Sequence, residues 1–310
     1  MKELKVFRTC GELRAWRLEK YKSRGAQKVG FVPTMGALHD GHLKLILHAI
    51  SEVGPEGSVV VSIFVNPTQF APDEDFDVYP RTLDRDLEVL NSLDLQNMHE
   101  LVVFAPSVKE MYPSLESISQ VLEKGTFVNV VGLTEMLEGN VRPGFFRGVA
   151  TVVSKLLVLV HPDIAVFGQK DVQQCFVVKR MALDMLFEPG VIKVVETYRD
   201  PVDGLALSSR NVYLTKEQRT HAPAMYRGLL LAKNLFLEKG VVASAQLIDC
   251  VLQELEKEGK EHFSVDYIKV SSSSDLSDVE RIGPEGAIMS CAWRMGTTRL
   301  IDNILLGFSF

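Results

Sequence analysis

Cysteine is scarce in this sequence, and its spacing forms no paired pattern. The 310 residues include four cysteines that lie far apart, with no Cys-x-x-Cys: Cys10, Cys175, Cys250 and Cys291. Sparse, unpatterned cysteines are typical of free thiols in a reducing compartment. No apolar run reaches membrane-spanning length, and the first residues lack the apolar core of a signal peptide. We therefore expect a cytoplasmic protein with no membrane partner.

An excess of positive charge is also missing. Lys and Arg number 34 against 40 Asp and Glu, which gives a formal net charge of −6. No nucleic-acid partner is expected for such a chain. An acidic protein that handles anions must gather its positive side chains locally. The length suits one large domain or two ordinary ones, and 46% hydrophobic with 24% charged residues is the profile of a globular protein.

The familiar phosphate-binding loops are absent, but one stretch offers similar chemistry. The sequence has no Gly-x-x-x-x-Gly-Lys-Ser/Thr, no Gly-x-Gly-x-x-Gly and no His-Glu-x-x-His. Residues 33–42 instead connect an apolar strand, 29–32, to a helical pattern. The two glycines of this turn let the backbone approach a ligand, and a helix N-terminus suits a phosphate. His39 and His42 add hydrogen-bond donors.

Strands and helices alternate from residue 28 to 197, which predicts an α/β protein with a Rossmann-like doubly wound parallel sheet. The punctuated segment 199–204 predicts a boundary between domains 1–198 and 199–310. Helices followed by clustered strands indicate a smaller C-terminal α+β domain. A capping box at 215–218 opens a helix that we extend to Lys239. The other predicted strands of the first domain are 58–65, 101–105, 126–131, 163–167 and 191–197.

Polar side chains follow two of these strands. Asn66 and Gln69 lie where the 58–65 strand ends at a proline, and the carboxyl ends of parallel strands are where ligands bind. Their amides suit a substrate with hydroxyl and carboxylate groups. On spacing alone, an Asn-Pro turn with a surface Gln is the favoured interpretation.

Two further stretches carry cations. Lys170 lies at the end of the 163–167 strand, where it can neutralise phosphate. Asp171 either caps the next helix or orients Lys170, a sugar hydroxyl group of a ligand or a metal ion. One of two adjacent glutamines, Gln173 or Gln174, points to the site. In the 205–211 stretch an arginine offers bidentate donors beside two serine hydroxyls. Read alone, that stretch is a polar turn.

The run Pro-Thr-Met-Gly-Ala-Leu-His-x-Gly-His at 33–42 resembles the signature of the pantothenate synthetase (pantoate–β-alanine ligase) family. That family belongs to the larger group of nucleotidylyltransferases and class I aminoacyl-tRNA synthetases, which share a His-x-Gly-His type motif. Runs at 64–70, 79–82, 142–153 and 299–303 also resemble it. The resemblance covers nearly the whole chain and is densest from 28 to 213.

The resemblance implies an ATP-dependent ligase that joins (R)-pantoate to β-alanine through a pantoyl adenylate, releasing AMP and diphosphate. It implies ATP and Mg²⁺ as cofactors, without fixing the metal ligands, and a homodimer. Another nucleotidylyltransferase of the same superfamily is the alternative, because the opening motif is shared across the group.

The resemblance also implies the site residues. Gln69 and Gln174 correspond to pantoate-binding positions, with Asn66 beside them. The residues implied to be catalytic are His39, His42, Lys170 and Arg210. The residues implied to hold ATP are Pro33, Thr34, Met35, Gly36, Ala37, Leu38, His39, Asp40, Gly41, His42, Gly168, Gln169, Lys170, Asp171, Leu207, Ser208, Ser209 and Arg210.

Some positions depart from the family pattern. Phe145 stands where many members have His, and Gln169 where many have Glu. Arg85 lies where some members have an acidic residue near the metal, which leaves its neighbours Asp84 and Asp86 as weak Mg²⁺ candidates.

The segment 199–203 is one residue longer than in many members. Whether Tyr198 or Arg199 meets the adenine therefore stays open.

Overall fold

The computed structural model describes residues 4–22, 27–70, 76–93, 100–114, 124–188 and 190–310. The chain forms two compact units, each with its own sheet. The first contains Met1–Gly168 and Gln173–Val195, and the second contains Gln169–Val172 and Glu196–Phe310. Across the described ranges, no helix has both the length and the apolar character needed to cross a membrane.

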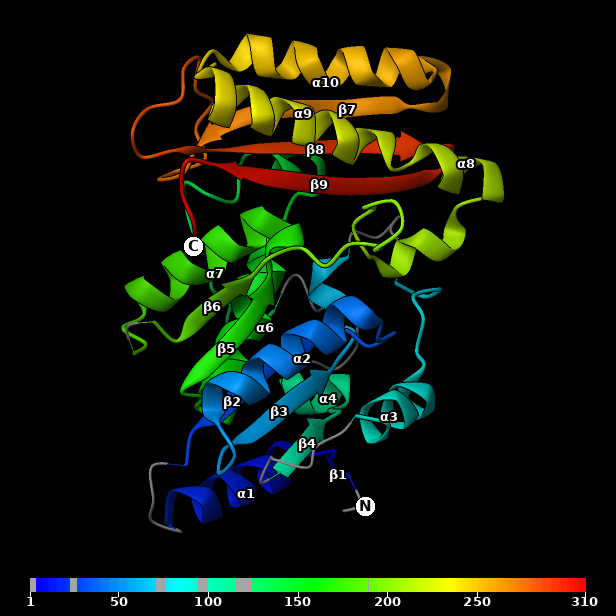
Figure 1. Ribbon diagram of the computed structural model, residues 1–310. Helices are drawn as coiled ribbons and strands as arrows, with labels where there is room; N and C mark the ends of the chain where they lie inside the picture. Colours follow the sequence, from blue (N-terminus) through cyan, green and yellow to red (C-terminus); the bar gives the residue numbers. More distant parts are fainter. Residues whose placement is uncertain (1–3, 23–26, 71–75, 94–99, 115–123, 189) are drawn as a thin grey trace. The chain divides into compact units, whose positions relative to one another are not determined.

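The first unit is built on a six-stranded sheet in the order β1-β4-β3-β2-β5-β6, in which every neighbouring pair is parallel (Figure 1). The predicted doubly wound sheet is confirmed. Its strands are β1 (Lys5–Phe7), β2 (Val29–Thr34), β3 (Ser58–Ile63), β4 (Glu100–Phe104), β5 (Ile164–Gly168) and β6 (Ile192–Val195). The central strands are buried on both faces, which explains their continuous Val and Ile runs.

Strand order reverses beside β2. The chain passes from β2 to β3 and β4 on one side, and then to β5 and β6 on the other. In open α/β sheets such a reversal opens a crevice outside the carboxyl ends of the strands, where ligands bind. The turn at 33–42 leaves β2 at this point, and the Asn66 turn leaves the neighbouring β3. The topology thus brings two of the predicted ligand-binding stretches to one edge of the sheet.

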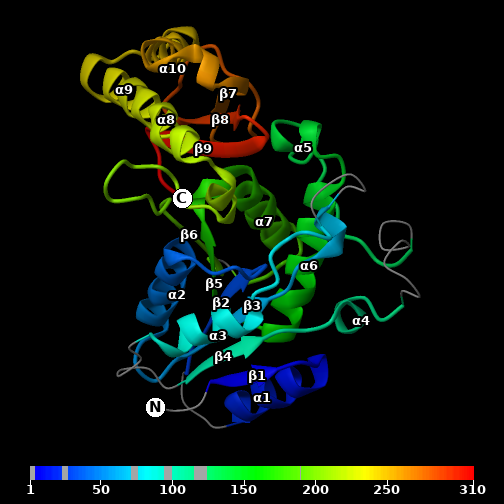
Figure 2. The same ribbon diagram turned by 90° about the vertical axis from the view of Figure 1, so that its right-hand side faces the viewer.

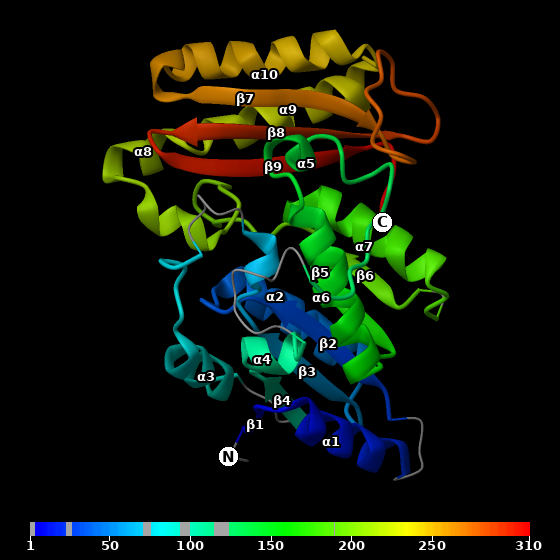
Figure 3. The same ribbon diagram turned by 180° about the vertical axis from the view of Figure 1, so that it is seen from behind.

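Helices cover both faces of this sheet. α2 and α3 lie on one face and α1 and α6 on the other, as Figures 1 and 3 show from opposite sides. α6 is apolar nearly all round, and twelve of its residues are buried. The helices of this unit are α1 (Cys10–Lys22), α2 (Asp40–Val53), η1 (Pro67–Gln69), α3 (Leu83–Asn91), α4 (Val108–Met111), α5 (Glu138–Val141), α6 (Phe145–Val160) and α7 (Val172–Asp184), the last of which starts at the second unit's Val172.

The sequence prediction for this unit missed one strand and included one that does not form. The three-residue strand β1 was not predicted, because its partner β4 lies about a hundred residues away and the strand is too short to show a period. Residues 126–131 form no strand. The backbone N–H of Val128 donates instead to Thr151 Oγ1 on α6, at 2.9 Å. A β-branched run therefore packs against a helix here.

The second unit is the predicted smaller α+β domain. Three antiparallel strands are covered on one face by α9 and α10 (Figure 2), which bury a common apolar core with them. The capping box of Thr215 and Gln218 is confirmed, but the helix ends at His221 because Pro223 follows. The elements are η3 (Gln169–Asp171), η4 (Ser209–Tyr213), α8 (Lys216–His221), α9 (Ala224–Lys239), α10 (Ser244–Glu258), η5 (Lys260–His262), β7 (Ser264–Ser272), β8 (Ala287–Met295) and β9 (Thr298–Leu306).

Candidate active site

The turn after β2 has a backbone that few sequences adopt. Gly36 and Ala37 have φ of +83° and +51°, so two successive residues lie in the left-handed region. A Cβ at Gly36 would lie 3.0 Å from Asp86 Oδ2 and 3.1 Å from Ile63 Cγ2, tight contacts that add to the preference for glycine set by its φ. His39 then caps α2 in an extended conformation.

The two histidines of the turn form a reciprocal capping box. His39 Nδ1 accepts from the N–H of Gly41 at 3.1 Å, and His42 Nδ1 accepts from the N–H of His39 at 3.3 Å. Their ring centroids are 4.1 Å apart. Because both Nδ1 atoms accept, each neutral ring carries its proton on Nε2 and is a donor there. The helix N-terminus was expected to offer its N–H groups to a phosphate, but the Gly41 N–H already donates to His39. The Nε2–H groups of the two rings are the donors that suit a phosphate.

Asp86 holds the turn in place from α3. The residue is 1% exposed. Oδ2 accepts from the N–H of Ala37 at 3.0 Å, and Oδ1 accepts from the N–H of Leu38 at 2.8 Å. The Thr82 hydroxyl lies 3.3 Å from both oxygens. The sequence marked Asp86 only as a weak Mg²⁺ candidate, whereas both of its oxygens here bind the backbone of the turn.

A buried hydrogen-bond relay orients the amide of Gln69. Asn66 Oδ1 accepts from the N–H of Thr68 (3.4 Å) and from the Tyr112 hydroxyl (2.7 Å). Asn66 Nδ2 faces the carbonyl of Gly148 at 3.3 Å and donates to Gln69 Oε1 at 3.0 Å. The N–H of Thr68 can only donate and the carbonyl of Gly148 can only accept, so together they fix the orientation of the Asn66 amide. Gln69 must then turn Oε1 toward Asn66, which leaves Nε2 as the atom it can offer to a ligand.

The residues of this relay are buried. Burial raises the pKa of Tyr112 to about 12, so the phenol keeps the proton it donates. Gln69 is 8% exposed, so the surface-Gln interpretation was wrong. Its carbonyl accepts from Arg142 Nη2 at 3.0 Å. A Cβ at Gly148 would lie 2.3 Å from the carbonyl oxygen of Thr68, so only glycine lets α6 pack on η1.

The two adjacent glutamines of α7 have different surroundings. Gln173 is 3% exposed, and its Nε2 donates to the carbonyls of Leu133 and Met136 at 2.9 and 2.8 Å. Its Oε1 accepts from the N–H of Glu138 at 2.9 Å. Gln173 thus holds the 133–138 segment. Gln174 is half-buried and stays the candidate of the pair for a substrate.

The turn that carries Lys170 is held within the second unit by β9. Asn303 Nδ2 donates to the carbonyls of Gln169 and Lys170, at 2.9 and 3.0 Å. Gln169 Nε2 donates to Asn303 Oδ1 at 3.0 Å. The glutamine that departs from the family pattern is therefore buried in an amide pair. Asp171 Oδ1 is 3.2 Å from Lys170 Nζ, which favours the orienting role for Asp171.

The Ser208–Arg210 stretch opens the 3₁₀ helix η4. Ser208 is its N-cap, and its hydroxyl accepts from the N–H of Arg210 at 3.2 Å. Asn211 Nδ2 donates to the carbonyl of Ala206 at 3.0 Å. The cap gives this stretch a defined backbone. Leu207, Ser208, Ser209 and Arg210 are all half-buried.

Arg199 forms an ion pair inside the second unit. Its guanidinium donates to both oxygens of the fully buried Asp302 carboxylate, at 2.6 and 2.8 Å. It also lies 3.5 Å from the centroid of the Tyr226 ring. A bidentate pair of this kind fixes the fold of the domain, which leaves Tyr198 as the better candidate for a contact with adenine.

Three residues hold the predicted stretches in place: Tyr112, Asp86 and Asn303. The sequence assigned no role to Tyr112 or Asn303, and it marked Asp86 only as a weak Mg²⁺ candidate. Asn303 lies in the 299–303 run that carried the resemblance, so a signal was present. Tyr112 had no local signal. Phe145, the other departure, lies 3.8 Å beneath the Arg142 guanidinium and makes a cation–π contact there.

The parallel sheet reverses beside β2, and a His-x-Gly-His turn leaves that strand, so the first unit is a doubly wound α/β protein with this turn at its reversal point. The family model described as Pantoate-beta-alanine ligase matches residues 5–305, and the chain belongs to that family.

Known relatives match along the whole length. The chain is 42% identical to pantoate–beta-alanine ligase of Saccharomyces cerevisiae, over 98% of this chain and 100% of the relative. The solved pantothenate synthetase of Thermus thermophilus is 41% identical, with a TM-score of 0.81 over 97% of this chain and 99% of that one. The pantoate-beta-alanine ligase of Francisella tularensis, solved with beta-gamma ATP and beta-alanine, is 32% identical, with a TM-score of 0.74 over 99% of each chain.

Proposed function

We infer that this chain is an ATP-dependent ligase that joins (R)-pantoate to β-alanine. The family membership of nearly the whole chain supports the reaction class. The observation that carries the chemistry is the turn after β2, where two imidazoles are fixed as Nε2–H donors at the reversal point of the sheet. Donors so placed suit the phosphates of a nucleotide.

The reaction has two steps. The pantoate carboxylate attacks the α-phosphorus of ATP, the bond to the bridging oxygen breaks, and diphosphate leaves with the electron pair. The amine of β-alanine then attacks the acyl carbon of the adenylate, AMP leaves, and the amine loses a proton to form the amide. No side chain forms a covalent bond in this scheme. The protein places the reactants and stabilises developing charge.

In the first unit, His39 and His42 donate from Nε2 to the phosphate oxygens. Gln69 donates from Nε2 to a hydroxyl or carboxylate oxygen of pantoate, because the relay from Asn66 fixes its amide. Gln174 contacts the same substrate. This unit therefore serves nucleotide and pantoate binding.

In the second unit, Lys170 and Arg210 supply positive charge for ATP, with hydroxyls from Ser208 and Ser209. The capped backbone at Ser208 and the contacts of Asn303 with the Lys170 turn give both cations a defined starting position. Two cations and two imidazole donors answer how a chain of net charge −6 handles a polyanion. We propose that this unit acts as a lid in the reaction.

Mg²⁺ enters this proposal with ATP. Mg²⁺ prefers oxygen ligands and is usually held by one or two carboxylates together with substrate phosphates. Both Asp86 oxygens accept backbone N–H groups, and Asp171 pairs with Lys170. Within the described ranges, no group of three ligating side chains forms around the turn. We therefore propose Mg²⁺ bound mainly through the phosphates, and we assign no protein ligand to it.

Oligomeric state and location follow from the resemblance and the composition. We propose a homodimer, which light scattering on the purified chain tests. We also propose a reducing, cytoplasmic compartment, because all four cysteines are free thiols; labelling of the protein in intact cells tests it.

One assay separates this ligase from another nucleotidylyltransferase. AMP and diphosphate formation is measured with both substrates, with each alone and with neither. We expect sustained turnover only when pantoate and β-alanine are both present. Sustained diphosphate release without pantoate would refute the proposed function.

Two variants test the residue roles. We expect His42→Ala and Lys170→Ala to lower the rate of pantoyl-adenylate formation by about 10²–10³-fold, the range found for loss of one charge-stabilising group, while the fold is retained. His48→Ala, on the same helix α2, is the matched control and should keep the rate. Near-normal diphosphate release in either test variant would refute its role.

A further inference from the structure

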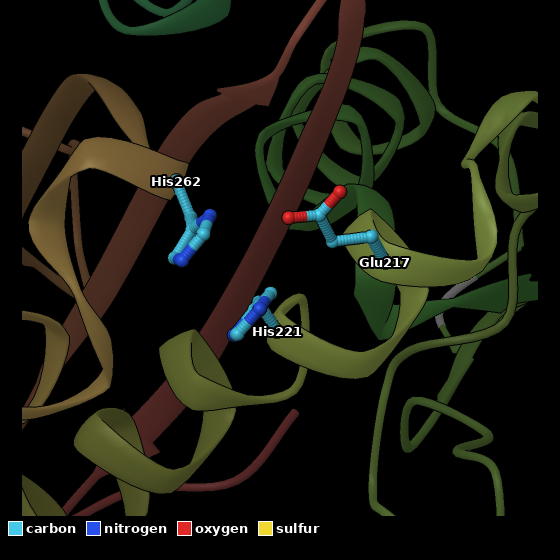
Figure 4. A group of neighbouring side chains, drawn as sticks. All are labelled: Glu217, His221 and His262. Carbon is cyan, nitrogen blue, oxygen red and sulfur yellow. The ribbon is translucent and has the colours of Figure 1, made fainter.

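The second unit carries a cluster of metal-ligating side chains that the ligase reaction does not use. Glu217 and His221 lie one turn apart on α8, and His262 lies on η5, between α10 and β7 (Figure 4). One ligand atom from each residue lies within 4.8 Å of the other two. Figure 4 shows the two imidazoles face to face with the carboxylate beside them.

The two imidazole rings of the cluster are stacked. Their centroids are 3.8 Å apart and their planes differ by 9°. Two imidazolium cations would repel each other at this distance, whereas neutral imidazole is the form that binds a metal. The pair therefore places two imidazole rings, each with a possible nitrogen ligand, close together.

A neighbouring carboxylate sets the tautomer of one ring. His221 Nδ1 lies 2.8 Å from Glu258 Oε1, and the other oxygen of Glu258 accepts from Arg227. The Glu258 carboxylate accepts a hydrogen bond from Nδ1–H, so Nε2 is the nitrogen of His221 that can bind a metal. Metal-binding histidines are commonly oriented by a carboxylate in this way. Glu261 adds negative charge near His262, with Oε1 4.0 Å from Nε2.

We propose that Glu217, His221 and His262 bind one divalent transition-metal ion, with Zn²⁺ as the representative ion. Two imidazole nitrogens and one carboxylate oxygen suit Zn²⁺, Ni²⁺ or Cu²⁺, and leave a coordination position for water. Mg²⁺ prefers an all-oxygen set and does not compete.

Binding requires a small closure of the cluster. Ligand atoms around a tetrahedral Zn²⁺ with bonds of about 2.0–2.1 Å lie about 3.3 Å apart, so the widest separation must shrink from at most 4.8 Å. Glu217 is exposed, and both histidines are half-buried. Rotation of these side chains, with the rings turning out of their stack, can bring the ligand atoms together without moving the core.

The bound ion would tie two segments of the second unit together. α8 follows the Ser208–Arg210 stretch, whereas η5 connects α10 to β7. A ligand that binds only the folded protein raises the apparent folding constant by a factor of 1 + [ligand]/Kd, about 100-fold at 100 times Kd. We therefore expect Zn²⁺ to raise the melting temperature of the chain.

The test uses the full chain, freed of metal by dialysis against a chelator and titrated with ZnCl₂ in a calorimeter. We expect one saturable site per chain that MgCl₂ does not occupy. His221→Gln and His262→Gln should each weaken Zn²⁺ binding at least 100-fold and abolish the thermal shift. Glu258→Gln should weaken binding about 10–100-fold, the effect of losing an orienting partner.

A second measurement identifies the ligands directly. Electron paramagnetic resonance of the Cu²⁺-loaded chain should show coupling to two imidazole nitrogens, and to one in either histidine variant.

The matched control is His48→Gln. His48 also has a glutamate one turn away, Glu52, with a 3.9 Å contact, but it lies on α2 and not in the cluster. This variant should bind Zn²⁺ as the unaltered chain does. The absence of a saturable Zn²⁺ site, or binding that survives both His221→Gln and His262→Gln, would overturn the proposal.

Discussion

Asp86→Asn replaces one of the two carboxylate oxygens that hold the turn after β2. Asp86 is almost fully buried, and each of its oxygens accepts one backbone N–H of the turn. An asparagine keeps one acceptor and turns an NH₂ group toward the other N–H. The substitution therefore changes one contact from attraction to opposition with almost no change in volume.

The expected cost follows from those contacts. A hydrogen bond to a charged group contributes about 1.5–3 kcal/mol, and the remaining bond becomes an ordinary one of about 0.5–1.5 kcal/mol. We expect the free energy of unfolding to fall by about 2–4 kcal/mol. Ala37 has a left-handed backbone, which is unfavourable for a residue with a Cβ, so the released turn should relax. Each 1.4 kcal/mol lost from ATP binding is tenfold, and we expect KM for ATP to rise about tenfold or more.

Urea unfolding and the KM for ATP measure the two effects. Asp84→Asn is the matched control, because Asp84 lies in the same turn of α3 but is exposed. It should change neither quantity. A Mg²⁺ titration separates the two possible roles of Asp86: a lost metal ligand would be compensated by more Mg²⁺, whereas a lost backbone contact would not. Recovery of activity at high Mg²⁺, or unchanged stability and KM in Asp86→Asn, would refute our reasoning.

Three further substitutions test other contacts. Gln173→Glu sets a carboxylate against two backbone carbonyls that now receive N–H bonds. Each carbonyl left without a donor costs about 1–3 kcal/mol, so urea titration should show the free energy of unfolding fall by about 2–6 kcal/mol. A fall below about 1 kcal/mol would contradict the assignment. Gly148→Ala places a Cβ 2.3 Å from the carbonyl oxygen of Thr68. Such overpacking lowers the free energy of unfolding by about 1–3 kcal/mol. We also expect the Gln69 relay to shift, which should raise the KM for pantoate in steady-state kinetics. Glu100 loses hydration by burial, but hydrogen bonds from two lysines and an indole lower its pKa to about 2. Because its folded pKa lies below the unfolded value, ionised Glu100 stabilises the folded protein above about pH 4.5. The side chain is 14% exposed, and its contribution to the free energy of unfolding is about 3 kcal/mol. This contribution is lost as the pH falls toward 2. Urea unfolding at pH 7, 5 and 3 should therefore show a smaller decline in Glu100→Gln than in the unaltered chain; equal declines would count against this contribution.

The sequence by itself determined the elements whose signals are local. The strand, turn and helix from 29 to 50 follow from an apolar run, two glycines and a helical period. The same holds for the capping box at Thr215, because a cap is made by residues three positions apart. The helix break at Pro223 was also readable locally, and extending that helix to Lys239 underrated the proline.

Only the tertiary structure decided how the ligand-binding stretches are held. The turn after β2 depends on Asp86, 48 positions from Leu38, and the Lys170 turn depends on Asn303, 133 positions away. The direction of the Gln69 amide depends on Tyr112, a proton donor 46 positions from Asn66. Periodicity reports which face of an element is buried, but it does not report which distant side chain meets that face. The histidines that suit phosphate were therefore visible in the sequence, whereas the groups that fix their turn and aim the substrate amide required the folded chain.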